Sequence, residues 1–271
     1  MKIGIIGYGS MGKMLLRKFS EKKNISKDDL FAANRTAAKL EEAADIATIC
    51  GSNGELACKA DIVFVCVRPA DIRVVLEEIK GAVKENTLIV SLNGSIQFSL
   101  MENIIDHKMA KVIPSVTAEI DQSQTLVCFN DKVAESDKET LKELLTCIGT
   151  VRELPEDKMG MGSELVSCMP GFIASIFDVI CRSAGKHVDF PPEMIVEMVL
   201  NTMKATGNLM LEKGMSFEDV VTRVATKGGI TQEGTKVIYE MFPEAADELF
   251  EKTLEKRRIV AEQANNITTI E

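Results

Sequence analysis

The chain has 271 residues, of which 45% are hydrophobic and 27% charged, as in soluble proteins that bury a core. This length predicts one large or two medium domains. The 41 acidic residues outnumber the 32 basic ones and give a formal net charge of −9. Because no long basic block interrupts this acidity, we do not expect nucleic acid as the main partner.

The seven cysteines are scattered without a C-x-x-C pair, and the two histidines, His107 and His187, lie far apart. This pattern predicts neither a disulfide framework nor a metal site. No uninterrupted apolar run approaches the roughly 18 residues of a membrane span, and the apolar segment near the N-terminus is too short for a signal peptide. We therefore expect a cytoplasmic protein without a membrane partner.

In residues 1–155, short apolar runs alternate with segments of helical periodicity. The runs of strand length are Ile3–Ile6, Leu30–Ala33, Ile62–Val67, Thr87–Leu92, Lys111–Ile113 and Thr125–Phe129. Apolar residues at helical spacing occur in Met11–Phe19, Ile72–Ile79 and Thr140–Cys147. Alternating strands and helices predict a parallel, doubly wound sheet, so we expect an α/β Rossmann-type domain here.

Residues 156–271 predict an all-α domain. The stretch Met161–Ile180 is apolar around much of its circumference, and Pro170 can kink the helix it predicts. So much apolar surface exceeds what a four- or five-helix cluster can cover. We therefore predict contact with a second subunit, in a homodimer or higher homo-oligomer. The alternative is that this helix is simply the central helix of its own domain.

Capping signals divide the rest of the helical half. A helix is predicted from Pro191 and Pro192 to about Lys213, with Gly214 as the residue that ends it. Ser216 with Asp219 predicts a capping box at the start of another helix. After a turn, the helical pattern runs to about Met241, and Pro243 is expected to begin a separate last helix. The charged segment Lys252–Arg258 is interpreted as a solvated face of that helix.

The segment Gly7-Tyr8-Gly9-Ser10-Met11-Gly12 follows the first predicted strand and opens a helix. In this context the G-x-G-x-x-G pattern predicts a dinucleotide site. The first glycine allows the tight turn, the second admits the pyrophosphate, and the third permits close helix–strand packing. The expected cofactor-binding residues are Gly7, Gly9, Ser10, Met11 and Gly12. A triphosphate-binding loop is excluded because Met14 stands where a magnesium-binding Ser or Thr is needed.

The second predicted strand ends in Ala33-Asn34-Arg35-Thr36, without the acidic residue that usually binds the adenosine ribose. Arg35 can pair with a 2′-phosphate, and Asn34 can donate to it. A charge-assisted hydrogen bond contributes about 1.5–3 kcal/mol, or a tenfold to hundredfold preference. We therefore predict NADPH as the cofactor, with NADH weaker. The alternative is that Arg35 is a solvated arginine at a helix start.

Over nearly its whole length the chain resembles the pyrroline-5-carboxylate reductase family, which reduces a cyclic imine to proline with a nicotinamide cofactor. The segments that carry the resemblance are Gly7–Gly12, Asn34–Thr36, Val67-Arg68-Pro69, Val90–Ile96, Lys111–Pro114 and Val224–Thr231. The last is similar to the family signature Thr-Ser-Pro-Gly-Gly-Thr/Ala-Thr. The resemblance implies homodimers with interlocked helical domains. It also adds Val67, Arg68, Pro69 and Asn93 to the expected cofactor site.

Imine reduction needs a hydride donor, a proton or hydrogen bond for the nitrogen, and a pocket for the substrate carboxylate. Gly228 and Gly229 leave backbone amides uncovered, and a helix beginning near Thr231 presents unpaired N–H groups. We expect Gly228, Gly229, Ile230 and Thr231 to bind the carboxylate. The resemblance implies that Thr231 hydrogen-bonds the ring nitrogen, which makes it the candidate catalytic residue. The alternative is an ordinary helix N-cap threonine.

Several segments depart from the family pattern. Ile113–Ala118 stands where the family has Met-Pro-Asn-Thr-Pro-Ala, Ser167–Gly171 replaces Gly-Ser-Gly-Pro-Ala, and Lys227 replaces a proline. The leading hypothesis is an NADPH-dependent reductase that makes L-proline from 1-pyrroline-5-carboxylate, the last step of proline biosynthesis. A second is a reductase of the same fold acting on a different imine or ketone. A third is a non-catalytic, dinucleotide-binding regulatory homologue.

Overall fold

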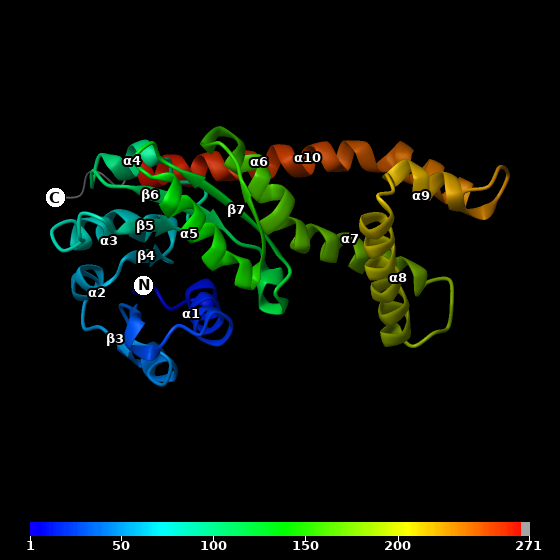
Figure 1. The fold of residues 1–271 in the computed structure, drawn as a ribbon. Helices are drawn as coiled ribbons and strands as arrows, with labels where there is room; N and C mark the ends of the chain where they lie inside the picture. Colours follow the sequence, from blue (N-terminus) through cyan, green and yellow to red (C-terminus); the bar gives the residue numbers. More distant parts are fainter. Residues whose placement is uncertain (267–271) are drawn as a thin grey trace. The chain divides into compact units, whose positions relative to one another are not determined.

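The computed structural model describes residues 1–266, and the side chains up to residue 264. The chain forms two compact units (Figure 1). The sheet unit is Met1–Pro170 together with the last helix from Thr253 onward, and the helical unit is Gly171–Lys252. This division falls later than the predicted domain boundary at residue 155, because Met159 and Val166 pack against the core of the sheet unit.

The sheet unit contains an eight-stranded sheet in the order β3-β2-β1-β4-β5-β6-β7-β8. Its strands are β1 (Ile3–Ile6), β2 (Leu30–Ala33), β3 (Thr48–Ile49), β4 (Ile62–Val65), β5 (Leu88–Ser91), β6 (Met109–Ile113), β7 (Ser123–Phe129) and β8 (Gly149–Glu153). All neighbours pair in parallel except β6 and β7, which are antiparallel. The strand order reverses beside β1, which confirms the Rossmann-type class.

Helices cover both faces of this sheet. They are α1 (Ser10–Lys23), α2 (Asn53–Lys59), α3 (Ile72–Ile79), α4 (Phe98–Glu102), α5 (Glu135–Leu145) and α6 (Met159–Ser163). Successive residues of β4 point to opposite faces: Phe64 packs in a core with α1 and α5, and Val65 packs in a core with α2, α3 and α4. This alternation gives the predicted doubly wound arrangement.

Apolar runs in the sequence do not predict β3 and β8. β3 has only two residues, neither of them buried, and every residue of β8 is at least partly exposed. Both lie at the edges of the sheet, where one side of the strand has no neighbour. The antiparallel β7 is also unexpected, because its apolar run resembles the run of a parallel strand.

The helices of the second half are α7 (Met169–Ala184), α8 (Pro192–Lys213), α9 (Phe217–Val224) and α10 (Ile230–Asn266). As predicted, Gly214 ends α8 in the left-handed conformation, and Ser216 with Asp219 forms the capping box of α9. The predicted break before Pro243 is wrong, because α10 continues through this residue. A proline removes one hydrogen bond of the ladder, and in a helix of 37 residues the turns on either side persist.

The segment before Pro170 is irregular. A π-helical turn, Glu164–Cys168, separates α6 from α7, so the expected irregularity is this turn, immediately before the proline. Within the described chain no residue of α7 is buried, which argues against a central helix covered by its own domain. By length and composition alone Glu156–Ala184 could span a membrane, and 6% of its most apolar window is buried.

Candidate active site

The glycine turn at the end of β1 has the geometry that its sequence predicts. Gly7 has φ +94°, and a Cβ there would lie 2.6 Å from the Cys66 carbonyl oxygen. A Cβ on Gly12 would lie 2.1 Å from the Gly7 carbonyl oxygen, so α1 packs against the turn too closely for a side chain. A Cβ on Gly9 would meet nothing within 4 Å. This open space is where a pyrophosphate can approach the backbone.

Gly9 precedes α1 without a side-chain cap, so the first amides of the helix, at Ser10 and Met11, are available to an anion. The end of β2 is tied to this turn by Asn34. Its Oδ1 accepts from the Tyr8 amide at 3.0 Å, and its Nδ2 donates to the Thr36 carbonyl at 2.9 Å. Asn34 therefore orders the loop in which Arg35 lies.

Two arginines meet beside this loop. The Arg35 side chain is 82% exposed, and its Nη1 lies 3.6 Å from Asp71 Oδ1. Arg68, in the loop after β4, places its Nε 2.9 Å from Asp71 Oδ2. One carboxylate thus holds two cations together at the carboxyl edge of the sheet. A phosphate group carries the negative charge needed to replace the Asp71 carboxylate as the partner of both arginines.

The ends of β4 and β5 carry the remaining expected cofactor residues. Asn93, which is 7% exposed, donates from Nδ2 to the Val67 carbonyl at 3.0 Å. Its amide donates to Ser91 Oγ at 3.2 Å. Val67, Arg68 and Pro69 therefore lie beside the Asn93 loop. A dinucleotide bound across the carboxyl ends of a doubly wound sheet has its adenosine half over the first two strands, so it would place its nicotinamide half at this edge.

A buried lysine, to which the sequence pattern assigns a place in a strand but no role in the site, lies behind the Asn93 loop. Lys111, in the middle of β6, is 1% exposed. Its Nζ donates to the Ile96 carbonyl at 3.0 Å, forms an ion pair with Glu156, and lies 4.9 Å from the centre of the Phe98 ring. Glu156 Oε1 also accepts from the Phe98 amide at 2.8 Å. The far end of the loop is therefore fixed by a paired, buried charge.

The interpretation of Lys252–Arg258 as a solvated face is wrong at Arg257. Arg258 is exposed and pairs with Glu255 and Glu262 on its own helix, as expected of such a face. Arg257 instead donates from Nε and Nη2 to Glu164 Oε1, at 3.1 and 2.7 Å, inside the sheet unit. Ala264, seven residues later and on the same helical face, is also buried, so this side of α10 faces the interior.

Cys168 adjoins this pair at the end of the π-helical turn. Burial raises the pKa of its thiol, and the charge of Glu164 raises it further, with Arg257 acting in the opposite direction. The raised pKa disfavours the thiolate, which is the nucleophilic form of cysteine.

The expected substrate turn lies in the helical unit. Gly228 has φ +73°, and a Cβ on Gly229 would lie 2.6 Å from Thr226 Oγ1, so both positions favour glycine. The Gly228 amide donates to Gln232 Oε1 and the Gly229 amide to the Thr226 carbonyl, each at 2.8 Å. Thr231 is exposed within the first turn of α10 rather than before it, where an N-cap residue would stand. The amides of Ile230 and Thr231 belong to this first turn, which has no intrahelical acceptors.

Comparisons with known proteins agree with this arrangement. Residues 2–94 match the sequence model described as "NADP oxidoreductase coenzyme F420-dependent". Residues 156–259 match the one described as "Pyrroline-5-carboxylate reductase dimerisation", which begins at the predicted boundary. The crystal structure of Plasmodium falciparum pyrroline carboxylate reductase with NADP bound has the same fold. It gives a TM-score of 0.86 at 22% identity, over 96% of this chain and 98% of that one.

Two proteins of Bacillus subtilis (strain 168) are similar in sequence over almost the full length. ComE operon protein 4 is 25% identical over 93% of this chain and 94% of its own. Pyrroline-5-carboxylate reductase 3 is 34% identical over 98% of this chain and 99% of its own. With this identity over both domains, the chain belongs to the pyrroline-5-carboxylate reductase family, as its motifs predict.

Proposed function

We propose that this protein is an NADPH-dependent pyrroline-5-carboxylate reductase, which reduces the C=N bond of 1-pyrroline-5-carboxylate and forms L-proline, the last step of proline biosynthesis. The proposal is supported by the presence, in one chain of this family, of a turn that can bind the dinucleotide and a turn that can bind the substrate. The Gly7–Gly12 turn leaves room for a dinucleotide at Gly9, and the Gly228–Thr231 turn begins a long helix. We also propose that the protein acts in the cytoplasm.

The cofactor residues divide by function. Gly7, Gly9 and Gly12 let the amides of Ser10 and Met11 bind the pyrophosphate. Arg35, with Arg68 beside it, pairs with the 2′-phosphate in place of Asp71. Val67, Pro69 and Asn93 form the edge for the nicotinamide half, and the bound cofactor supplies the hydride.

The substrate residues act on the other atoms of the imine. Carbon receives the hydride and nitrogen must gain a proton, so a donor is needed at the ring nitrogen. The Thr231 hydroxyl is that donor or the relay to it. The amides of Ile230 and Thr231 bind the carboxylate, and the Gly228 amide joins them when Gln232 Oε1 is displaced.

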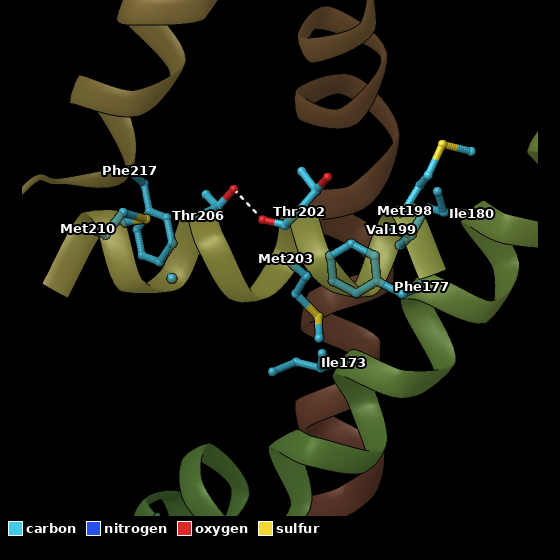
Figure 2. Close-up of a pocket in the computed structure, with 11 residues that line it drawn as sticks. Ile173, Phe177, Ile180, Met198, Val199, Thr202, Met203, Thr206, Met210 and Phe217 are labelled. Carbon is cyan, nitrogen blue, oxygen red and sulfur yellow. Dashed lines mark hydrogen bonds between the residues drawn. The ribbon is translucent and has the colours of Figure 1, made fainter. Parts of the chain in front are cut away.

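The apolar surface of the helical unit supports assembly with further copies of the chain. A cavity of about 560 Å³ lies between α7 and α8, with Phe217 of α9 at one end (Figure 2). Its lining includes Ile173, Phe177, Ile180 and Met203, which are apolar. The dimerisation match covers this region and the apolar segment Glu156–Ala184. We attribute both to contact with a second copy in a homodimer or higher oligomer, rather than to a membrane.

The reaction is tested with purified protein, NADPH and pyrroline-5-carboxylate. We expect turnover, and we expect Thr231→Ala to lower kcat by about a hundredfold or more while NADPH binding is unchanged. Thr235→Ala, one turn later on α10, is the matched control, because its hydroxyl bonds only the Gln232 carbonyl of its own helix. Turnover that survives Thr231→Ala contradicts the role of this residue.

The same assay separates two other functions. Turnover only with other imines or ketones would indicate a different substrate, such as one with an added negative group that the exposed Lys227 could pair with. NADPH binding without any turnover would indicate a regulatory protein. The similarity to ComE operon protein 4, whose name is not that of a reductase, supports a regulatory function as the alternative.

The choice of cofactor is tested at Arg35. Arg35→Ala should lower the preference for NADPH over NADH about tenfold to a hundredfold, because the charge-assisted contact with the 2′-phosphate is lost. Affinity for NADH should hardly change. Lys39→Ala, at another exposed basic position shortly after Arg35, is the control. An unchanged NADPH/NADH ratio in Arg35→Ala would remove this assignment and leave Arg35 as a solvated arginine.

A further inference from the structure

We propose that Arg257 and Glu164 are positioning residues for the nicotinamide half of the cofactor, which they orient through Ser95. This inference rests on the proposed function, since it assumes that a dinucleotide binds over the Asn93 loop. It assigns a role to the C-terminal part of α10 in the geometry of hydride transfer. Neither residue belongs to the motifs by which the site is identified in the sequence.

The pair is buried and its geometry is specific. The Glu164 side chain is 2% exposed and that of Arg257 is 19% exposed. Besides its two bonds to Glu164, the guanidinium donates from Nη2 to Ser163 Oγ at 3.0 Å and from Nη1 to Ser95 Oγ at 3.2 Å. A planar guanidinium held by one carboxylate has little freedom to rotate. Its remaining N–H groups therefore point at fixed positions, and one of them is occupied by Ser95.

Ser95 lies within the loop that is expected to meet the nicotinamide. Arg257 Nη1 would lie 3.7 Å from a Cβ on Gly94, and Ile113 Cδ1 would lie 2.4 Å from the same Cβ, so this loop has no room to shift toward β6. On its other side Asn93 is bonded to the Val67 carbonyl. A displacement of Ser95 would therefore be transmitted to Asn93 and to the end of β4.

Stability alone does not explain this pair. Taking two charges out of water costs about as much as their attraction returns, so apolar side chains of similar size can stabilise a protein as well as a buried ion pair does. An apolar pair, however, would offer Ser95 no hydrogen bond of defined direction. With Lys111 bonded to the Ile96 carbonyl, the loop is held at two adjacent residues by two paired cations. The pair therefore contributes to the orientation of the loop.

The test compares two ligands that differ only in the nicotinamide half. Affinities for NADPH and for 2′-phospho-ADP-ribose, which keeps the second ribose and lacks only the nicotinamide ring, are measured for the wild type, Arg257→Gln and Glu164→Gln. Single-turnover hydride transfer is measured alongside. Arg258→Gln is the matched control, because the neighbouring Arg258 pairs only with Glu255 and Glu262 on the surface of α10.

We expect Arg257→Gln to slow hydride transfer by roughly tenfold to a hundredfold, the range that a misplacement of about 1 Å produces. It should lower the affinity for NADPH but change the affinity for 2′-phospho-ADP-ribose by less than about twofold, since the contacts of the adenosine half are intact. Glu164→Gln should change the same quantities less. Ser95→Ala removes only the accepting hydroxyl, and it should also lower the affinity for NADPH without changing that for 2′-phospho-ADP-ribose. This variant provides the test if the charge variants do not fold.

Equal weakening of both ligands would show a merely structural role and overturn the proposal. So would unchanged hydride transfer in Arg257→Gln. A wild-type protein that binds NADPH without reducing the imine would contradict the proposed function only, because the comparison of the two ligands needs no turnover.

Discussion

Ile79 on α3 and Ile180 on α7 are the same residue on two amphipathic helices, yet Ile79 is fully buried and Ile180 is 45% exposed. The difference extends to their surroundings. In the sheet unit, α3 buries Ile72, Val75, Leu76 and Ile79 against the sheet. In the helical unit, α8 buries only Ile195 among its 22 residues within the described chain.

This contrast shows that the two units reach stability differently. Burying a large aliphatic side chain contributes about 1.5–3 kcal/mol, and the sheet unit obtains this contribution from its own helices. The helical unit leaves Val179, Leu200, Leu211 and Met241 exposed. An exposed apolar surface of this kind marks an interaction site. The sheet unit therefore covers its apolar side chains within one chain, whereas the helical unit leaves an apolar surface that homo-oligomerisation would cover.

The largest effect should come from a charge on the apolar face. Ile180→Asp places a carboxylate in the cavity between α7 and α8, where a second copy would have to bury it. An unpaired buried charge costs about 3–5 kcal/mol, so the dissociation constant of the dimer should rise by a hundredfold or more. Sedimentation or light scattering over a range of concentrations measures this change.

Val74→Asp is the control for this experiment. Val74 lies on α3 and is 56% exposed, so an aspartate there meets water in the monomer and in the oligomer alike. The oligomeric state should not change. If Ile180→Asp also left it unchanged, the apolar face would not be the subunit interface, and the comparison between the two units would lose its explanation.

A smaller effect should separate packing from binding within the sheet unit. Gly12→Ala forces a Cβ against the Gly7 carbonyl oxygen, so it should destabilise this unit by about 1–3 kcal/mol. Gly9→Ala meets no atom and should leave the melting temperature unchanged. It should still lower the affinity for NADPH about tenfold or more, because the methyl group would occupy the space that the pyrophosphate needs. Calorimetry and a binding titration would distinguish the two; equal melting temperatures for both variants would contradict the close packing at Gly12.

The sequence predicts those parts of the structure that depend on neighbours along the chain. Gly214 ends α8, and the Gly7–Gly12 turn has its expected geometry, because each depends on a few consecutive residues. β3 and β8 are missed, since an edge strand carries little apolar signal. Pro243 misleads, because local rules weigh the lost hydrogen bond and not the 37-residue helix around it.

The candidate site divides in the same way. Its glycines and Arg35 belong to motifs, whereas Arg257 reaches Ser95 and Glu164 across 162 and 93 positions of sequence. The sequence predicts Lys111 as part of a β-strand, and only the fold shows that its amine donates a hydrogen bond to the Ile96 carbonyl. Contacts of this kind depend on tertiary packing, so one sequence without a structure does not contain a local sign of them.

The smallest effect should show whether the helical unit is stabilised locally at all. Ser216→Ala removes the cap of α9 and should cost about 1 kcal/mol. Hydrogen bonds from the Ser216 amide and hydroxyl lower the pKa of Asp219, so the box contributes fully above the ordinary carboxyl pKa. Its contribution is lost as the pH falls through the lowered pKa, where the carboxyl group gains a proton in the folded state. Amide hydrogen exchange in α9 should therefore differ between the wild type and Asp219→Asn at neutral pH and converge in acid. A difference that persisted in acid would mean that Asp219 acts by another contact, and that the capping box is not what holds α9.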